Sequence, residues 1–160
     1  MKKIIESAAV LLIMIAASAL TGCNNSEPAA EPQLDVTPYN MAGCWSVSLW
    51  NGLELDQSSY VYLNLIRKER TFEMYDNLNS FSTHKTTGEY NIYTDDERGA
   101  MIRGRYDYGN GDWNHRYMVK SLTATQMVWV AADDESIVTL YERVESIPDE
   151  IVNAYPADEQ

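Results

Sequence analysis

The sequence predicts an all-β domain in the form of one closed, eight-stranded antiparallel up-and-down barrel. From residue 43 to residue 144, short runs rich in Val, Ile, Tyr, Trp and Thr are separated by clusters of Gly, Asn and Asp, and helix-period apolar patterns do not persist. The links between the runs are short, which favours antiparallel pairing of neighbours. An eight-stranded meander buries one face of every strand and has no open edge once its last strand pairs with its first. A two-sheet sandwich is the competing architecture.

Eight segments carry the strand pattern. In the first of them, Trp45, Val47 and Leu49 alternate with smaller side chains, so one face of the strand belongs in a core. In the fifth, Arg103 and Arg105 alternate with apolar residues and Gly, and which set faces inward is open. The predicted strands cover approximately residues 43–50, 59–66, 71–75, 87–94, 100–108, 115–121, 126–131 and 137–144.

Residues 1–22 have the pattern of a lipoprotein signal peptide. Two lysines precede an apolar run over 10–19 that is too short to be a comfortable membrane span. The run ends in Leu20-Thr21-Gly22-Cys23, which resembles the lipobox of bacterial lipoproteins. The resemblance implies cleavage before Cys23 and acylation there, and more than one acyl chain anchors a protein stably to a bilayer. Asn24, in place of Asp, favours the outer membrane, and the alternative is a secretory peptide with a chance cysteine.

Cleavage leaves a chain of usual size for one domain. It removes two lysines and one glutamate, so the net charge changes from −12 to −13, and nucleic acid is disfavoured as a partner. Residues 23–38, rich in Pro, Ala and acids, are predicted to be a flexible tether. The barrel is expected over 39–147 and an acidic C-terminal tail over 148–160, with a short helical turn near its start. A transmembrane barrel is disfavoured, because several strands are shorter than the roughly ten residues that it needs.

The two ends of the barrel segment carry a family resemblance. Gly43-Cys44-Trp45 resembles the Gly-x-Trp motif that opens the first strand of lipocalins, and Arg143 lies where that family places an arginine across the tryptophan. The resemblance, which spans about 39–147 in layout, is to lipocalin-like lipoproteins of Bacteroidetes-type bacteria. It implies that Gly43, Trp45 and Arg143 form a structural plug. A guanidinium that stacks on indole and donates to carbonyls would seal that end and join the first and last strands.

The mouth of the barrel is expected at the end opposite this plug, where ligands bind in such folds. Counting strand alternations places the longer links at the mouth: residues 51–58, 76–86, 109–114 and 132–136. Val138, among others, is also expected to face inward. The predicted ligand site combines interior and mouth residues: Trp50, Leu49, Leu63, Leu65, Met74, Trp113, Val119, Met127, Trp129 and Leu140.

Acidic residues dominate the predicted rim of the mouth. Such a rim would tolerate neutral or cationic amphipathic ligands and repel fatty-acid carboxylates, and exposed Tyr and Trp could stack on sugars. Turn geometry and solubility explain most of the same acids. The rim comprises Glu54, Asp56, Asp76, Asp112, Asp133, Asp134 and Glu135, against Lys85 and His84.

We therefore expect a monomeric, membrane-tethered protein of the cell envelope that binds a small apolar or amphipathic ligand. The alternative is a ligand-free barrel that acts as an interaction or accessory subunit of an envelope complex, and inhibition of periplasmic enzymes is a third hypothesis. No nucleophile motif such as Gly-x-Ser-x-Gly and no clustered metal-ligand spacing is present. We expect neither catalysis nor a cofactor or metal. Cys44 is expected to be a small filler on its strand.

Overall fold

The computed structural model describes residues 30–79 and 82–154. The predicted signal peptide, the predicted acylation site Cys23 and the last six residues lie outside the described part of the chain. Within it, the chain forms short strands and two short helices. In order these are α1 Pro38–Met41, β1 Gly43–Trp50, β2 Leu53–Glu54, β3 Val61–Ile66, β4 Thr71–Asp76, β5 His84–Asp95, β6 Gly99–Tyr106, β7 Tyr117–Leu122, β8 Gln126–Ala131, β9 Val138–Val144 and α2 Asp149–Asn153.

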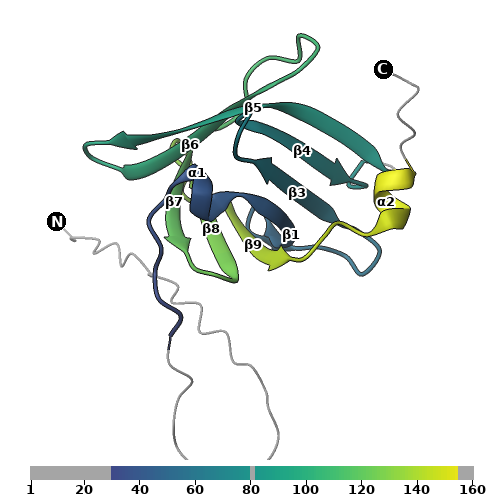
Figure 1. Cartoon of the computed structure of the whole chain (residues 1–160), viewed down its shortest axis with the longest axis horizontal. Helices are drawn as coiled ribbons and strands as arrows, with labels where there is room; N and C mark the ends of the chain where they lie inside the picture. Colours follow the sequence, from purple (N-terminus) through teal and green to yellow (C-terminus); the bar gives the residue numbers. More distant parts are fainter. Residues whose placement is uncertain (1–29, 80–81, 155–160) are drawn as a thin grey trace, which may run out of the picture. The chain divides into compact units, whose positions relative to one another are not determined.

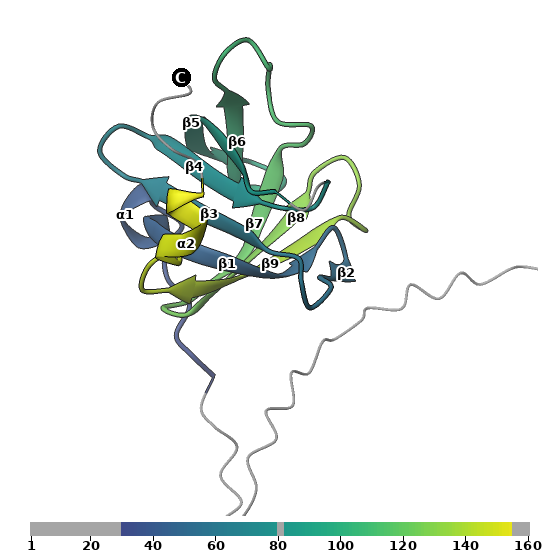
Figure 2. The same cartoon turned by 90° about the vertical axis from the view of Figure 1, so that its right-hand side faces the viewer.

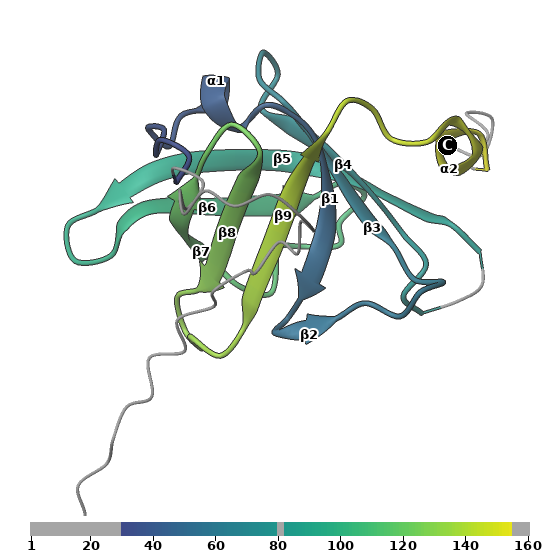
Figure 3. The ribbon, with the colours of Figure 1, turned by 90° about the horizontal axis from the view of Figure 1, so that it is seen from below.

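The strands close into a barrel. Each strand from β3 to β9 is antiparallel to the next, β3 pairs with β1, and β9 pairs back with β1, so eight strands surround one interior (Figure 1). The remaining strand, β2, folds back on the end of β1. Seen from below, β7, β8, β9 and β1 lie side by side in that order (Figure 3). The predicted all-β, eight-stranded up-and-down barrel is confirmed, and closure through β1 and β9 rules out the two-sheet sandwich.

Most strand ends agree with the sequence pattern to within two residues, and there are two larger differences. The two-residue strand β2 was not predicted, because Leu53 and Glu54 are too few to show an alternation. Strand β5 begins at His84 rather than at residue 87, and its extra residues pair with β4 up to Asp76. No helix among the described residues is both long and apolar enough to cross a membrane.

Three residues predicted to face inward lie outside the core. In β1 a bulge between Val47 and Leu49 changes the side on which the following residues point, so Trp50 packs on the core and Leu49 does not. In β9 the buried positions are Thr139 and Tyr141, and Val138 and Leu140 alternate with them on the other face. The predictions for Leu49, Leu140 and Val138 are therefore wrong. In β6, the burial pattern shows which side chains face inward: Ile102 and Gly104 are buried, whereas Arg103 and Arg105 are exposed.

The end of the barrel near the start of β1 is closed by Trp45 and Arg143. Trp45 is fully buried, and its Nε1 donates to the carbonyl of Met41 in α1 at 2.9 Å. The guanidinium of Arg143 lies 4.0 Å from the centre of the indole ring and donates to the carbonyls of Asn40, Ala42 and Ala124 at 2.6–2.8 Å. Arg143, on β9, thus links α1 and the residue that follows it to the turn between β7 and β8.

The residues before α1 lie against the barrel rather than away from it. The backbone N–H of Leu34 donates to the carbonyl of Leu122 at 2.7 Å, and the side chain of Leu34 packs on the core. The side chain of Gln33 exchanges hydrogen bonds with Ser121, and the carboxylate of Glu31 accepts from Thr125. A tether that runs to residue 38 is therefore too long: from Glu31 onward the chain is part of the folded unit.

A second, smaller cluster lies on the outer face of the barrel. Ile151 of α2 and Ile147 pack on Tyr75 of β4, and Cys44 contacts the same cluster. Figure 2 shows α2 in front of the strands of the barrel wall. Burial raises the pKa of the Cys44 thiol, which favours the unreactive, protonated form. Cys44 thus lies where a small apolar side chain is needed.

Candidate ligand site

A cavity of about 130 Å³ opens at the end of the barrel opposite Trp45 and Arg143. Its wall comes from the ends of β1, β3 and β4, from the segment before β7, and from β8 and β9. Aromatic side chains form most of this wall. The lining residues are Trp50, Asn51, Leu63, Phe72, Met74, Tyr106, Trp113, Asn114, His115, Tyr117, Trp129 and Tyr141.

The aromatic rings of the wall contact one another in a chain. Trp113 packs edge-on against Phe72 with ring centroids 5.1 Å apart and lies 5.8 Å from Trp129. Trp129 contacts Tyr117 at 5.6 Å and Tyr141 at 4.6 Å. Such tilted and edge-to-face pairs are favourable arrangements of aromatic quadrupoles, so the wall holds its own shape.

Two glycines make room for this wall. A Cβ on Gly104 would lie 2.2 Å from the Trp113 ring, and a Cβ on Gly88 would lie 2.7 Å from the Phe72 ring. Both glycines are buried, Gly104 on β6 and Gly88 on β5, at places where an aromatic ring approaches the backbone closely. Trp113 is further held by its backbone, since its N–H donates to the carbonyl of Gly104 at 2.9 Å.

Some polar atoms on the residues of the wall have no hydrogen-bond partner among the described residues. Trp129 is 2% exposed, and its Nε1 is a buried donor that makes no hydrogen bond to the described residues. The hydroxyls of Tyr106, Tyr117 and Tyr141 likewise form no hydrogen bond with the described part of the chain. A buried donor without an acceptor costs free energy, so this cavity favours an occupant that supplies hydrogen-bonding groups.

The cavity is also a poor environment for charge. Burial, with a smaller contribution from Tyr106 and Asp133, raises the pKa of Tyr117 to about 12. Burial raises the pKa of Tyr141 well above its ordinary value, and the phenols of Tyr117 and Tyr106 add to the effect. An environment that keeps phenols protonated also disfavours an anionic ligand group inside the cavity.

The folded protein should become less stable as the pH rises from 10 to 12. The pKa of Tyr117 is near 10 in the unfolded chain and about 12 in the folded protein, so in this window only the unfolded chain loses the proton. The free energy of unfolding should then fall by about 1.4 kcal/mol per pH unit, whereas below pH 10 the contribution is fully present. Urea unfolding at pH 9, 10 and 11 measures this slope.

Tyr117→Phe should remove part of that pH slope, because the variant has no proton to lose at this position. Tyr108→Phe is the matched control, since Tyr108 is 81% exposed. Identical slopes for the wild type and Tyr117→Phe would contradict the assignment of a buried, protonated phenol.

The structure brings together only part of the predicted site. Trp50, Leu63, Met74, Trp113 and Trp129 line the cavity. Leu65, Val119 and Met127 are buried in the core but are not part of the cavity wall. Leu49 and Leu140 are on the outer face, for the reasons given above.

Sequence reasoning missed the tyrosines and two residues of the segment before β7, Asn114 and His115. Tyr141 and Tyr117 were not assigned to the interior, because tyrosine is equally suited to an exposed strand face. A signal for Tyr141 was available: Arg143 must face Trp45, and a period of two then places Tyr141 on the same face. Asn114 and His115 lie in an irregular segment, for which the sequence gives no facing rule.

The segment Trp113–Arg116 separates the cavity from a larger groove of about 690 Å³ on the outside of the barrel. Strands β6 and β7 pair at only two positions, Met101 with Met118 and Ile102 with Tyr117. Beyond that point residues 112–113 pair with β6 instead, through a bridge between Arg105 and Asp112. Trp113, Asn114 and His115 line both spaces, so this segment is a thin wall.

The acidic residues of the predicted mouth serve different purposes. The carboxylate of Asp134 accepts from the N–H and hydroxyl of Ser136, and that of Asp76 accepts from the N–H of Leu78, as in local turns. Asp133 accepts from Nδ1 of His115 at 2.9 Å, which lowers the pKa of that carboxyl. No group of three or more His, Cys, Asp or Glu side chains in the described ranges could hold a metal ion.

Comparison with known proteins identifies a structural likeness. No family model and no curated protein matches the chain. The structure is similar to a crystal structure of a lipocalin-like protein from Bacteroides uniformis, with a TM-score of 0.48 and 16% identity, over 66% of this chain and 99% of that one. The fold is lipocalin-like. That description rests on the closed eight-stranded meander itself, and a match at this level of identity says nothing about a ligand.

Proposed function

We propose that this lipocalin-like barrel binds a small, neutral molecule with one ring-sized apolar body and a hydrogen-bond acceptor in the cavity at its mouth. The observation that carries the proposal is Trp129, whose ring lines the aromatic cavity and whose Nε1 is a buried donor without a partner among the described residues. A ligand acceptor there would satisfy a group that the protein leaves unsatisfied. The tyrosine hydroxyls of the same wall could donate to or accept from such a ligand.

The size of the cavity limits the occupant. Pockets for drug-sized ligands measure about 300–1,000 Å³, whereas an apolar cavity of about 150 Å³ holds a benzene ring. At about 130 Å³, this cavity suits one ring with a short polar substituent rather than a fatty acid. The raised pKa of Tyr117 supports a neutral ligand, because the same environment penalises a carboxylate.

The setting proposed for this activity is the bacterial envelope. The lipobox-like Leu20-Thr21-Gly22-Cys23 supports a lipid anchor at Cys23, and Asn24 supports the outer membrane. The folded unit begins at Glu31, so a tether of a few residues would separate it from the lipid.

The four tryptophan indoles allow a direct test. In a proton–nitrogen correlation spectrum of the full-length protein in detergent, acetophenone should shift the Nε1–H signal of Trp129, assigned with Trp129→Phe. Toluene, which has the ring but no acceptor, should bind more weakly by roughly tenfold, because the donor stays unpaired. Benzoate should bind more weakly still, because its charge would be buried.

The Nε1–H of Trp45 is an internal control, since it is already bound to the carbonyl of Met41 at the closed end and should not move. Native mass spectrometry of protein purified from its own host should show a small bound molecule. If acetophenone leaves the Trp129 signal unchanged at millimolar concentration and the native spectrum shows only protein, the binding function is wrong. An accessory role in an envelope complex would then be the better hypothesis.

A further inference from the structure

The groove on the outside of the barrel collects positive charge in a strongly acidic protein. The chain has a net charge of −12, yet four of its seven arginines line this groove: Arg98, Arg103, Arg105 and Arg116. They come from the β5–β6 turn, from β6 and from the segment before β7. Strands and loops from both sides of the β6–β7 opening therefore direct cationic side chains to one place.

These guanidinium groups form no close ion pair among the described residues, although Glu89, Asp112 and Asp133 share the lining of the groove. In the described part of the chain, none of the four has a carboxylate within 4.0 Å. Arg103 is instead held over the ring of Tyr93, with its guanidinium carbon 5.7 Å from the centroid. Four arginines face three carboxylates in this lining, so an anionic ligand would add charge-assisted hydrogen bonds to guanidinium groups that have no close ion-pair partner among the described residues.

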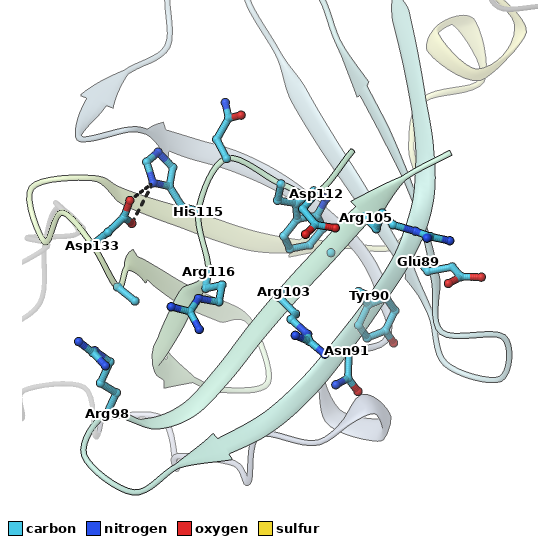
Figure 4. A pocket seen from close by; sticks show the side chains of 14 residues that line it. Glu89, Tyr90, Asn91, Arg98, Arg103, Arg105, Asp112, His115, Arg116 and Asp133 are labelled. Carbon is cyan, nitrogen blue, oxygen red and sulfur yellow. Dashed lines mark hydrogen bonds and ion pairs between the residues drawn. The ribbon is translucent and has the colours of Figure 1, made fainter. Parts of the chain in front are cut away.

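The two ends of the groove differ in chemistry. Arg98 and Arg116 lie toward one side, Arg105 and Glu89 toward the other, and Arg103 lies between them beside Asn91 (Figure 4). Carboxylates such as Glu89 and Asp112, with the amides of Asn91 and Asn114, are acceptors that suit the hydroxyl groups of a ligand. Trp113 adds an aromatic surface between the groove and the cavity.

We infer that this groove binds an acidic sugar: a small polyhydroxylated molecule whose anionic group lies against Arg103 and Arg116. The guanidinium fork matches both carboxylate and phosphate, so a uronic acid and a sugar phosphate share the required chemistry. A groove of about 690 Å³ is large enough for a sugar and far larger than one anionic group needs. The inference is independent of the cavity ligand, because the groove lies on the other side of the Trp113–Arg116 wall.

Calorimetric titration of the full-length protein in detergent tests this inference with four probes: glucuronate, glucose 6-phosphate, glucose and inorganic phosphate. Glucuronate or glucose 6-phosphate should bind, and glucose and phosphate should each bind roughly tenfold more weakly, because each lacks one half of the recognition. Binding of the acidic sugars should weaken as salt is added.

Variants locate the site. Arg103→Gln and Arg116→Gln should each weaken binding of the acidic sugar roughly tenfold, since each removes a charge-assisted hydrogen bond. Arg67→Gln is the matched control, because Arg67 lies over Tyr39, away from the groove, and should bind like the wild type. Acetophenone in the cavity should not be needed for sugar binding, so failure of one proposal is distinguishable from failure of the other.

Three results would overturn the inference. No detectable heat with either acidic sugar would show that the groove does not bind this class. Equal affinity for inorganic phosphate and glucose 6-phosphate would indicate an anion site without sugar recognition. Equal weakening by Arg67→Gln and Arg103→Gln would place any binding outside the groove.

Discussion

Replacing Arg143 by alanine should lower the free energy of unfolding by about 3 kcal/mol, because one side chain holds three parts of the closed end together. Its guanidinium donates to three backbone carbonyls and lies 4.0 Å from the Trp45 ring centroid. Alanine would leave those carbonyls unpaired and expose the indole face that the guanidinium covers. Urea unfolding measures the loss, and the melting temperature should fall by roughly 10 °C.

Two variants show whether the geometry or merely the charge is responsible. Arg143→Lys keeps a cation but cannot reach three carbonyls with a planar fork, so it should recover less than half of the lost stability. Arg67→Ala also removes an arginine from an aromatic ring, but Tyr39 is 72% exposed, and the change should be below about 0.5 kcal/mol. If Arg143→Ala unfolds like Arg67→Ala, the closed end does not depend on this residue.

The sequence allowed the barrel to be predicted because its signals are local and repeated. Short alternating strands with short links restrict the topology to a meander. A meander of eight strands loses its two open edges when the last strand pairs with the first. The contact between the ends, from Trp45 to Arg143, joins residues far apart in sequence. It was reached through a family motif, since no periodicity within the chain implies it.

The interior was harder to predict than the strands, for two physical reasons. A single bulge after Val47 reverses the side on which the remaining side chains of β1 point. One extra residue of this kind cannot be recognised in an alternating sequence pattern. In β9, apolar Val138 and Leu140 compete with Thr139 and Tyr141 for the inner face. Hydrophobicity favours the first pair, but the inner face is taken by Thr139 and by Tyr141, which lines the cavity.

The wall of the candidate site illustrates a limit of pattern-based prediction. Trp113 was predicted from its position in a mouth loop, but its place depends on pairing with Gly104, a contact outside the eight-strand pattern. Two of the four groove arginines, Arg103 and Arg105, belong to the strand whose inward-facing side the sequence left open. The structure shows that Ile102 and Gly104 are buried inside the barrel, so Arg103 and Arg105, which alternate with them, point outward.

Gly88→Ala should be the most damaging small substitution in the barrel, at about 3 kcal/mol or more. The new Cβ would lie 2.1 Å from the carbonyl oxygen of Arg105 and 2.7 Å from the Phe72 ring. The ring can shift, but the carbonyl belongs to the backbone of β6, which pairs with β5 along this stretch. Relief therefore requires the two strands to separate. Urea unfolding measures the cost, with the exposed neighbour Glu89→Ala as a control that should stay within about 0.5 kcal/mol.

Gly104→Ala provides the informative contrast, because the three atoms nearest to its new Cβ all belong to the Trp113 ring, the closest at 2.2 Å. A half-buried side chain can move where a paired strand cannot, so the loss should be smaller, about 1–2 kcal/mol. The indole Nε1–H signal of Trp113 should shift strongly in the proton–nitrogen correlation spectrum, since the ring must move from its position between the cavity and the groove. If Gly104→Ala costs more than Gly88→Ala, or leaves the Trp113 signal in place, then Trp113 is not held by Gly104. The thin wall would then be fixed by Asn114, His115 and the hydrogen bond of the latter to Asp133.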